Sequence, residues 1–141
     1  MKGLVAYLNF DGQTREAMTF YAKCLGAKLE IFSFGDQMGE GLPKEMEPVK
    51  DRTMHAALSM GAGAILMASD TMPGMPLTAG NNFSVSVHPE SVEEVERLFA
   101  ALGEGGTVRM PLTDAAWGAR FGMLTDKFGI QWMFNYEYPK H

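Results

Sequence analysis

The sequence predicts an α+β fold built from two βαβββ modules. One observation is the order of hydrophobic patterns: an alternating apolar segment, an amphipathic segment and three more alternating segments, in a series that occurs twice. A second observation is spacing, because Thr14 and Ser91, which can cap helices, are separated by the same interval as Gly26 and Gly103, which can end them. The two halves therefore read as a duplicated pattern, although their sequence identity is weak.

A short segment rich in Pro and Gly, residues 71–80, is the natural linker between the modules. We expect a single domain over residues 1–141, with module 1 at about residues 1–70 and module 2 at about residues 81–138. A linker this short favours two modules that share one sheet system over two independent domains.

Module 1 is expected to contain four strands and one helix. Thr14 is the predicted N-cap of the helix, and Gly26 is the predicted end. The segment Gly35–Asp51 mixes charges with glycines and prolines, which predicts a long loop. The predicted strands are Leu4–Phe10, Leu29–Phe34, Met54–Met60 and Ala64–Ser69.

Module 2 repeats this order. Ser91 with Glu94 three residues later forms the pattern of a capping box, and Gly103 is the predicted end of that helix. The predicted strands are Asn82–Val87, Thr107–Leu112, Trp117–Thr125 and Ile130–Tyr136.

Composition places the chain among ordinary globular proteins and excludes several classes. It has 141 residues, of which 46% are hydrophobic and 21% are charged, and this balance excludes a disordered or coiled-coil chain. The net charge of -5 with no basic cluster predicts that nucleic acid is not a partner. No apolar run has the length of a membrane span, no signal pattern is present, and the single cysteine cannot form an internal disulfide, so we expect no membrane association and a cytoplasmic location.

Several segments resemble one known superfamily. The pattern lies in the segments Tyr7–Gly12, Arg15–Ala17, Phe20-Tyr21, Met54–Ala56, Ser69-Asp70 and above all Phe121–Asn135 (FGMLTDKFGIQWMFN). With the paired βαβββ order, these segments resemble the vicinal oxygen chelate superfamily (glyoxalase, bleomycin resistance and extradiol dioxygenase proteins), and within it the PhnB-like branch. The resemblance implies that each module curls into a half-barrel, that a ligand binds in the cleft between paired modules, and that the protein is a homodimer.

The resemblance also implies a test for a metal. Many members hold a divalent ion with His and Glu on the first and fourth strands of each module. The fourth-strand positions fall here at Met67 and Met133, and the first-strand positions fall near Ala6 and Phe83, with Tyr7 or Asn82 one residue away. A thioether suits soft copper(I) and is a poor ligand for the divalent ions of this chemistry. We therefore predict no cofactor and no metal ligands, and a divalent metal stays as an alternative.

His55 is the only histidine within a predicted strand. A neutral imidazole that faces a cleft can act as a general base or as a lone ligand, so His55 is the candidate catalytic residue. The alternative is a structural histidine at the sheet surface, because no carboxylate lies close in sequence to orient the ring.

The last predicted strand carries the strongest candidates for ligand binding. Gln131, Met133 and Asn135 share one face by period two, and the aromatic residues on the other face belong against the helix. Amides in a cavity need partners, which a polar ligand or the protein itself can supply. The candidate ligand-binding residues are Met67, Trp117, Phe121, Gln131, Met133 and Asn135.

These observations predict a PhnB-like protein that binds a small molecule in the cleft between its modules, and they leave open whether it is an enzyme. One alternative is a metal-dependent enzyme of the same fold, of the lyase, isomerase or dioxygenase type. Another is a drug-sequestering resistance protein, since such proteins need no metal.

Overall fold

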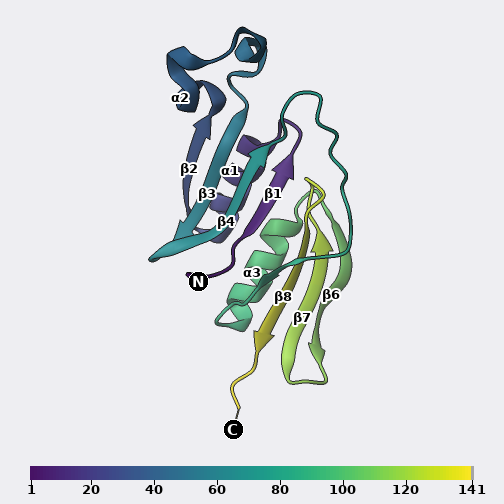
Figure 1. Cartoon of the computed structure of the whole chain (residues 1–141). Coiled ribbons are helices and arrows are strands. Elements are labelled where there is room, and N and C mark those ends of the chain that lie inside the picture. The colour runs from purple at the N-terminus through teal and green to yellow at the C-terminus, as the bar shows by residue number, and fades with distance from the viewer. Residues whose placement is uncertain (141) are drawn as a thin grey trace. The chain divides into compact units, whose positions relative to one another are not determined.

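The computed structural model describes residues 1–140 of the chain, which form two compact units (Figure 1). The first unit covers Met1–Thr78 and the second begins at Ala79. This boundary falls within the predicted linker, and each unit has the predicted βαβββ order.

Unit 1 is a four-stranded sheet with one long helix. Its strands lie in the order β1-β4-β3-β2, in which β1 and β4 are parallel and the other pairs are antiparallel. The elements are β1 (Ala6–Phe10), α1 (Thr14–Leu25), β2 (Lys28–Ser33), β3 (Thr53–Met60) and β4 (Gly63–Asp70).

Helix α1 begins for a different reason than its sequence suggests, and it ends as predicted. Its N-cap is Gln13, and Thr14 is the first helical residue, so the prediction that Thr14 caps the helix was wrong. Thr14 instead donates from its hydroxyl (2.8 Å) and its backbone N–H (3.0 Å) to the Asp70 carboxylate at the end of β4. The predicted end is confirmed, because Gly26 adopts a left-handed φ of 68°.

The predicted long loop at Gly35–Asp51 was also wrong. Three short helical segments fill most of this range: α2 (Phe34–Met38), η1 (Gly39–Gly41) and η2 (Lys44–Val49). The N-cap of α2 is Ser33, whose hydroxyl accepts from the Asp36 N–H while the Asp36 carboxylate accepts from the Ser33 N–H. This capping box was missed because Ser33 lies inside the segment that alternates like a strand.

Unit 2 repeats the topology, with strands in the order β5-β8-β7-β6 and a parallel pair between β5 and β8. The elements are β5 (Val85–Val87), α3 (Val92–Gly103), β6 (Thr107–Ala115), β7 (Ala119–Thr125) and β8 (Gln131–Glu137). Three predicted strands of this unit need correction, because β5 is shorter than Asn82–Val87, β6 continues beyond Leu112, and Trp117 lies in the turn before β7.

The caps of α3 follow the prediction only in part. The Ser91 hydroxyl accepts from the Glu94 N–H at 3.0 Å, but the Glu94 carboxylate accepts from the Glu90 N–H and so does not complete the capping box. Gly103 is the last helical residue, and the C-cap is Glu104, whose φ of -61° requires no glycine. Both long helices nevertheless have 12 residues, as the equal spacing predicts.

Each sheet has one face covered by its own helix and one face that its helix leaves open. Helix α1 packs on β2, β3 and β4, and α3 packs on β6, β7 and β8. In unit 2 the aromatic residues of β8 lie under the helix as predicted, since Trp132 and Phe134 are buried and the Phe99 and Phe134 rings are 5.2 Å apart. We call the opposite surfaces open face 1 (Tyr7, Asn9, His55, Ala57, Met67, Ser69) and open face 2 (Ser86, Met110, Phe121, Met123, Gln131, Met133, Asn135).

The helices of residues 1–140 include none with the length and apolar character needed to cross a bilayer.

Candidate functional site

Open face 1 places His55 beside a tyrosine. The Tyr7 hydroxyl and His55 Nδ1 are 3.0 Å apart, and the two rings lie 5.8 Å from each other. Tyr7 reaches across β4, where it pairs with Met67, and Met67 in turn pairs with Ala57 of β3. The predicted residues His55 and Met67 therefore share one surface, and Tyr7 is the residue that joins them.

This pair has a definite chemical capacity. With the Tyr7 hydroxyl as donor to Nδ1, the ring proton of His55 lies on Nε2, which then donates to whatever it faces. Within residues 1–140, His55 has no carboxylate partner of the kind that orients a catalytic histidine in an acid–base relay. The phenol fixes the ring instead, which suits binding of a polar group and does not by itself identify a reaction.

Open face 2 has an aromatic end. The Trp117 indole N–H donates to Asn135 Oδ1 at 3.2 Å, and the Trp117 and Phe121 rings meet edge to face at 5.4 Å. Phe121 and Asn135 are register partners on β7 and β8. Three predicted residues thus meet at one place, although Trp117 comes from the β6–β7 turn and its side chain is 63% exposed.

The middle of open face 2 is a row of methionines. Met133 pairs with Ser86 on one side and with Met123 on the other, and Met123 pairs with Met110. Thioether side chains give an apolar surface that adapts to the shape of what it contacts. Sequence reasoning found Met133 but missed Met110, whose alignment depends on a β-bulge next to it. It also missed Met123, which follows the predicted Phe121 by period two.

The third part of open face 2 is polar. Gln131 is 8% exposed, accepts a hydrogen bond from Arg109 at Oε1, and donates from Nε2 to the Gly80 carbonyl at 3.2 Å. A hollow of about 470 Å³ lies beside this amide. Both candidate amides, Gln131 and Asn135, therefore have hydrogen-bond partners within the protein, which is one of the two possibilities that the sequence left open.

The donor set of the open faces does not fit the divalent metal that the resemblance implies. Register places Tyr7 opposite Met67 and Ser86 opposite Met133, so the first-strand positions are not Ala6 and Phe83, and Phe83 lies before β5. Two thioethers, a phenol and a hydroxyl are weak ligands for zinc, nickel or manganese. Residues 1–140 also contain no group of three or more His, Cys, Asp and Glu side chains that could hold an ion. We assign no reaction step to a metal, and its absence from the protein stays a prediction.

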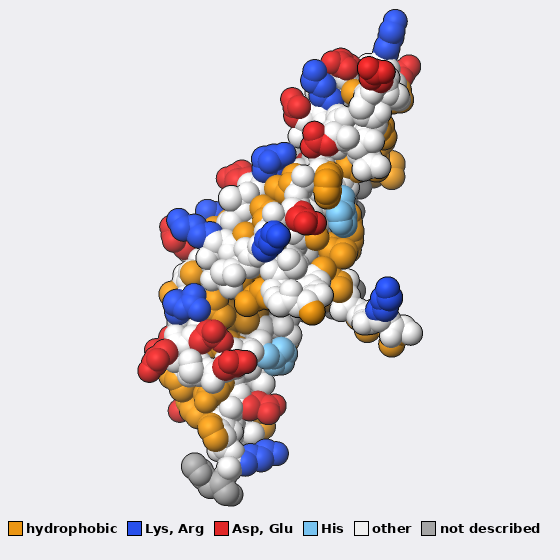
Figure 2. Space-filling view, turned by 90° about the vertical axis from the view of Figure 1, so that its left-hand side faces the viewer, with side chains coloured by type: hydrophobic (Ala, Val, Ile, Leu, Met, Phe, Trp, Pro, Cys, Tyr) orange, Lys and Arg blue, Asp and Glu red, His pale blue; other side chains and the backbone are white. Residues whose placement is uncertain are grey.

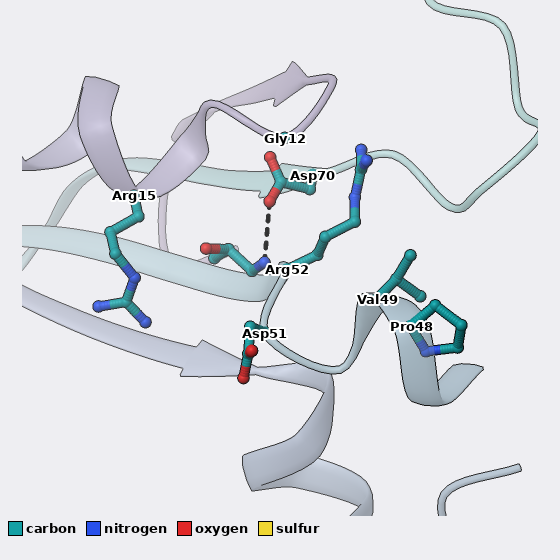
Figure 3. Close-up of a pocket in the computed structure, with 8 residues that line it drawn as sticks. Gly12, Arg15, Pro48, Val49, Asp51, Arg52 and Asp70 are labelled. Atoms are coloured by element: carbon teal, nitrogen blue, oxygen red, sulfur yellow. Dashed lines mark hydrogen bonds between the residues drawn. The ribbon is translucent and has the colours of Figure 1, made fainter. Parts of the chain in front are cut away.

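A second hollow lies in unit 1 at the start of α1 (Figure 3). Its volume is about 260 Å³, and Arg15, Asp51, Arg52 and Asp70 contribute its charged groups. The guanidinium groups of Arg15 and Arg52 extend in different directions and do not converge on one point. Arg52 is held by Asp11 at 2.8 Å, and Asp70 accepts from the backbone N–H of Thr53 at 2.8 Å. These contacts tie loops to the sheet and do not form an anion site.

The family model of the Glyoxalase/Bleomycin resistance protein/Dioxygenase superfamily matches residues 3–134. The chain belongs to this superfamily. The duplicated sheet units and the resemblance to this superfamily seen in the sequence are therefore confirmed.

Relatives within the superfamily cover almost the whole chain. Protein YjdN of Escherichia coli is 33% identical over 139 residues, which span 94% of this chain and 93% of that protein. The crystal structure of protein PA1353 from Pseudomonas aeruginosa is 45% identical, with a TM-score of 0.84 and coverage of 97% and 98% of the two chains. A Bacillus cereus structure whose name combines PhnB with 3-demethylubiquinone-9 3-methyltransferase is 24% identical, covers 96% and 99% of the two chains at a TM-score of 0.72, and supports the fold alone.

Proposed function

We propose that this protein binds a small organic molecule on open face 2. The observation that carries the proposal is the cluster of Trp117, Phe121 and Asn135, in which a largely exposed indole is held in place by a hydrogen bond to an amide. Small-molecule sites combine apolar and aromatic walls with a few fixed polar groups, and this cluster has both. The adjoining methionines extend the apolar wall along the strands.

The proposal is binding, and it includes no reaction. His55 with Tyr7 is a polar feature of open face 1, and we propose it as a second, separate candidate for contact with a polar group. Location of the ligand in a cleft between the modules, and a homodimer, remain predictions from the resemblance. No specific observation in the structure favours either alternative function, the metal-dependent enzyme or the drug-sequestering protein.

The proposal extends to the partners and the compartment. On the face shown in Figure 2, acidic and basic side chains are interspersed and neither sign forms a continuous patch, which supports the proposal that nucleic acid is not a partner.

The buried single cysteine, Cys24, suits the reducing cytoplasm, where we place the protein.

A thermal-shift screen tests the binding proposal. Polar aromatic and vicinal-oxygen compounds are tested against the parent, Asn135→Ala and His55→Ala, with Gln37→Ala on the exposed surface of α2 as the control. A ligand at 100 times its Kd stabilises the native state by about 2.7 kcal/mol, and a tenfold weaker site loses about 1.4 kcal/mol of that gain. We expect Asn135→Ala to lose a measurable part of the shift and Gln37→Ala to retain it. Equal stabilisation of Asn135→Ala and the parent would place binding elsewhere.

A further inference from the structure

The polar end of open face 2 contains an isolated positive charge. The hollow of about 470 Å³ is lined by Gly80, Asn81, Thr107, Arg109, Thr125 and Gln131, together with Gly129. Arg109 is the only charged residue among them. Thr107 and Thr125 are register partners on β6 and β7, so their hydroxyl-bearing side chains lie next to each other at this end of the sheet.

Three of the four other arginines form ion pairs within residues 1–140, whereas the exposed Arg109 does not. Arg52 pairs with Asp11, Arg97 with Glu94, and Arg120 with Glu96 and Asp114. Arg109 forms no ion pair within residues 1–140, and its one hydrogen bond there goes to the neutral amide of Gln131. A guanidinium has five N–H donors, so most of them have no acceptor in the described part of the chain.

Gln131 accepts a hydrogen bond from this guanidinium and, as a neutral amide, leaves its positive charge in place. Its amide is nearly buried and is fixed on both sides, by Arg109 at Oε1 and by the Gly80 carbonyl at Nε2. A carboxylate at this position would cancel the positive charge, whereas the amide orients it and leaves it available. The nearby Asp126 carboxylate accepts from the Phe128 and Ile130 N–H groups and from the Trp132 indole.

The geometry points to an elongated organic anion as the ligand, and this inference rests on the proposed function. We propose that its carboxylate or sulfonate group binds Arg109, and that its apolar body lies along the methionine row toward Trp117 and Phe121. Asn135 lies four positions after Gln131 on β8, and four steps of about 3.3 Å correspond to roughly 13 Å. A charged head and a body of this length match the two ends of open face 2.

Isothermal titration of matched compounds tests the inference. The probes are 4-phenylbutanoate, 3-phenylpropane-1-sulfonate and the neutral 4-phenylbutanamide, titrated into the parent, Arg109→Gln and the control Arg97→Gln. We expect the two anions to bind the parent at least tenfold more tightly than the amide. Arg109→Gln should weaken both anions about tenfold or more without changing the amide, and Arg97→Gln should change neither. Arg109→Lys, which keeps the charge and loses the planar fork, should bind the anions with intermediate affinity and serves if Arg109→Gln does not fold.

The outcomes separate this inference from the binding proposal. Two results would overturn the role of Arg109. In the first, the anions bind Arg109→Gln as tightly as they bind the parent. In the second, the parent binds the amide as tightly as it binds the anions. If either result is found but Trp117→Ala lowers the affinity of every probe, the proposed function survives and only the preference for an anionic head group is wrong. If no probe binds the parent, the anion inference is wrong, and the thermal-shift screen then decides whether open face 2 binds any small molecule.

Discussion

Two buried aspartates fix the chain at the ends of strands. Asp70 accepts from the backbone N–H and hydroxyl of Thr14 and from the Thr53 N–H, and thereby ties α1 and β3 to β4. Asp126 accepts from two N–H groups of the β7–β8 turn and from the Trp132 indole. Buried carboxylates are tolerated only when their oxygens are hydrogen-bonded in this way. The role of Asp70 could not be found from local sequence, because its donors come from Thr14 and Thr53, whereas the donors of Asp126 lie in the turn that follows it and on Trp132.

Replacement of Asp70 by Asn should destabilise unit 1. The amide keeps one acceptor oxygen, but its NH2 group then faces donors that lose their partner, and an unsatisfied buried donor costs about 1–3 kcal/mol. We expect Asp70→Asn to lower the free energy of unfolding by that amount in urea titrations. The matched change Asp51→Asn, at an exposed position, should have an effect within about 0.5 kcal/mol. Equal stability of the two variants would show that the Asp70 contacts are not structural.

Removal of the Tyr138 hydroxyl should raise the pKa of Asp114. The hydrogen bond from Tyr138 (2.6 Å), together with one from Arg120, holds the pKa of the Asp114 carboxyl below its ordinary value. A lowered folded-state pKa stabilises the protein above the unfolded value of about 3.9, and this stability is lost as pH falls through the folded pKa. Tyr138→Phe should therefore bring the Asp114 pKa, followed by NMR, closer to its ordinary value. An unchanged pKa would contradict the contact.

At the scale of elements, the connection from α3 to β6 depends on one close approach. A Cβ on Gly106 would lie 2.3 Å from the Thr125 carbonyl oxygen and 2.9 Å from Asp126 Cα. Both neighbours are backbone atoms of the β7–β8 end, which cannot move without disturbing the hairpin. The Gly106 position therefore sets how tightly the helix connection packs on the sheet.

Gly106→Ala should destabilise unit 2 by about 1–3 kcal/mol, the usual cost of overpacking. The control is Gly63→Ala at the start of β4, where a Cβ would meet no heavy atom within 4 Å. We expect the control to be neutral or slightly stabilising in thermal denaturation, because alanine reduces the entropy of the unfolded chain. A loss of stability in Gly63→Ala as large as in Gly106→Ala would remove the steric explanation.

The elements themselves could largely be predicted from hydrophobic period and turn residues. The predictions were wrong where a residue that matches a local pattern instead makes a tertiary contact or belongs to a second element. Thr14 has the chemistry of an N-cap, but Asp70 recruits its hydroxyl from another strand. Ser33 alternates with its neighbours like a strand residue and yet caps α2. The end of α3 at Gly103 was predicted correctly, although the residue that caps the helix is Glu104.

At the scale of the whole molecule, the duplicated topology followed from the sequence, and only part of the candidate site did. Period two identified the face of Gln131, Met133 and Asn135. Arg109 was missed because it reaches that face through the register of β6 against β7, which has bulges that no local pattern shows. Met123 follows the predicted Phe121 by period two, so a local pattern could have found it. The Tyr7–His55 contact joins residues 48 positions apart and likewise depends on the pairing of strands.

Native mass spectrometry with elemental analysis tests the predicted assembly and metal content. From protein purified without chelator, we expect a dimer and well under one divalent ion per chain, because the residues opposite Met67 and Met133 are poor ligands for such ions. Protein prepared with chelator should have the same mass and the same melting temperature. Stoichiometric zinc, nickel, iron or manganese, or a monomer, would contradict the corresponding prediction.

The most direct measurement of binding on open face 2 is methyl NMR of the methionines. The chain has 12 methionines, so 13C-methyl labelling reports on Met123 and Met133 of open face 2 and on Met18 and Met46 elsewhere in one spectrum. During titration with 4-phenylbutanoate and 4-phenylbutanamide, we expect saturable shifts of the Met123 and Met133 signals, with those of Met18 and Met46 unchanged. Saturable binding that leaves the Met123 and Met133 signals in place would show that the ligand lies elsewhere and would contradict the proposed site.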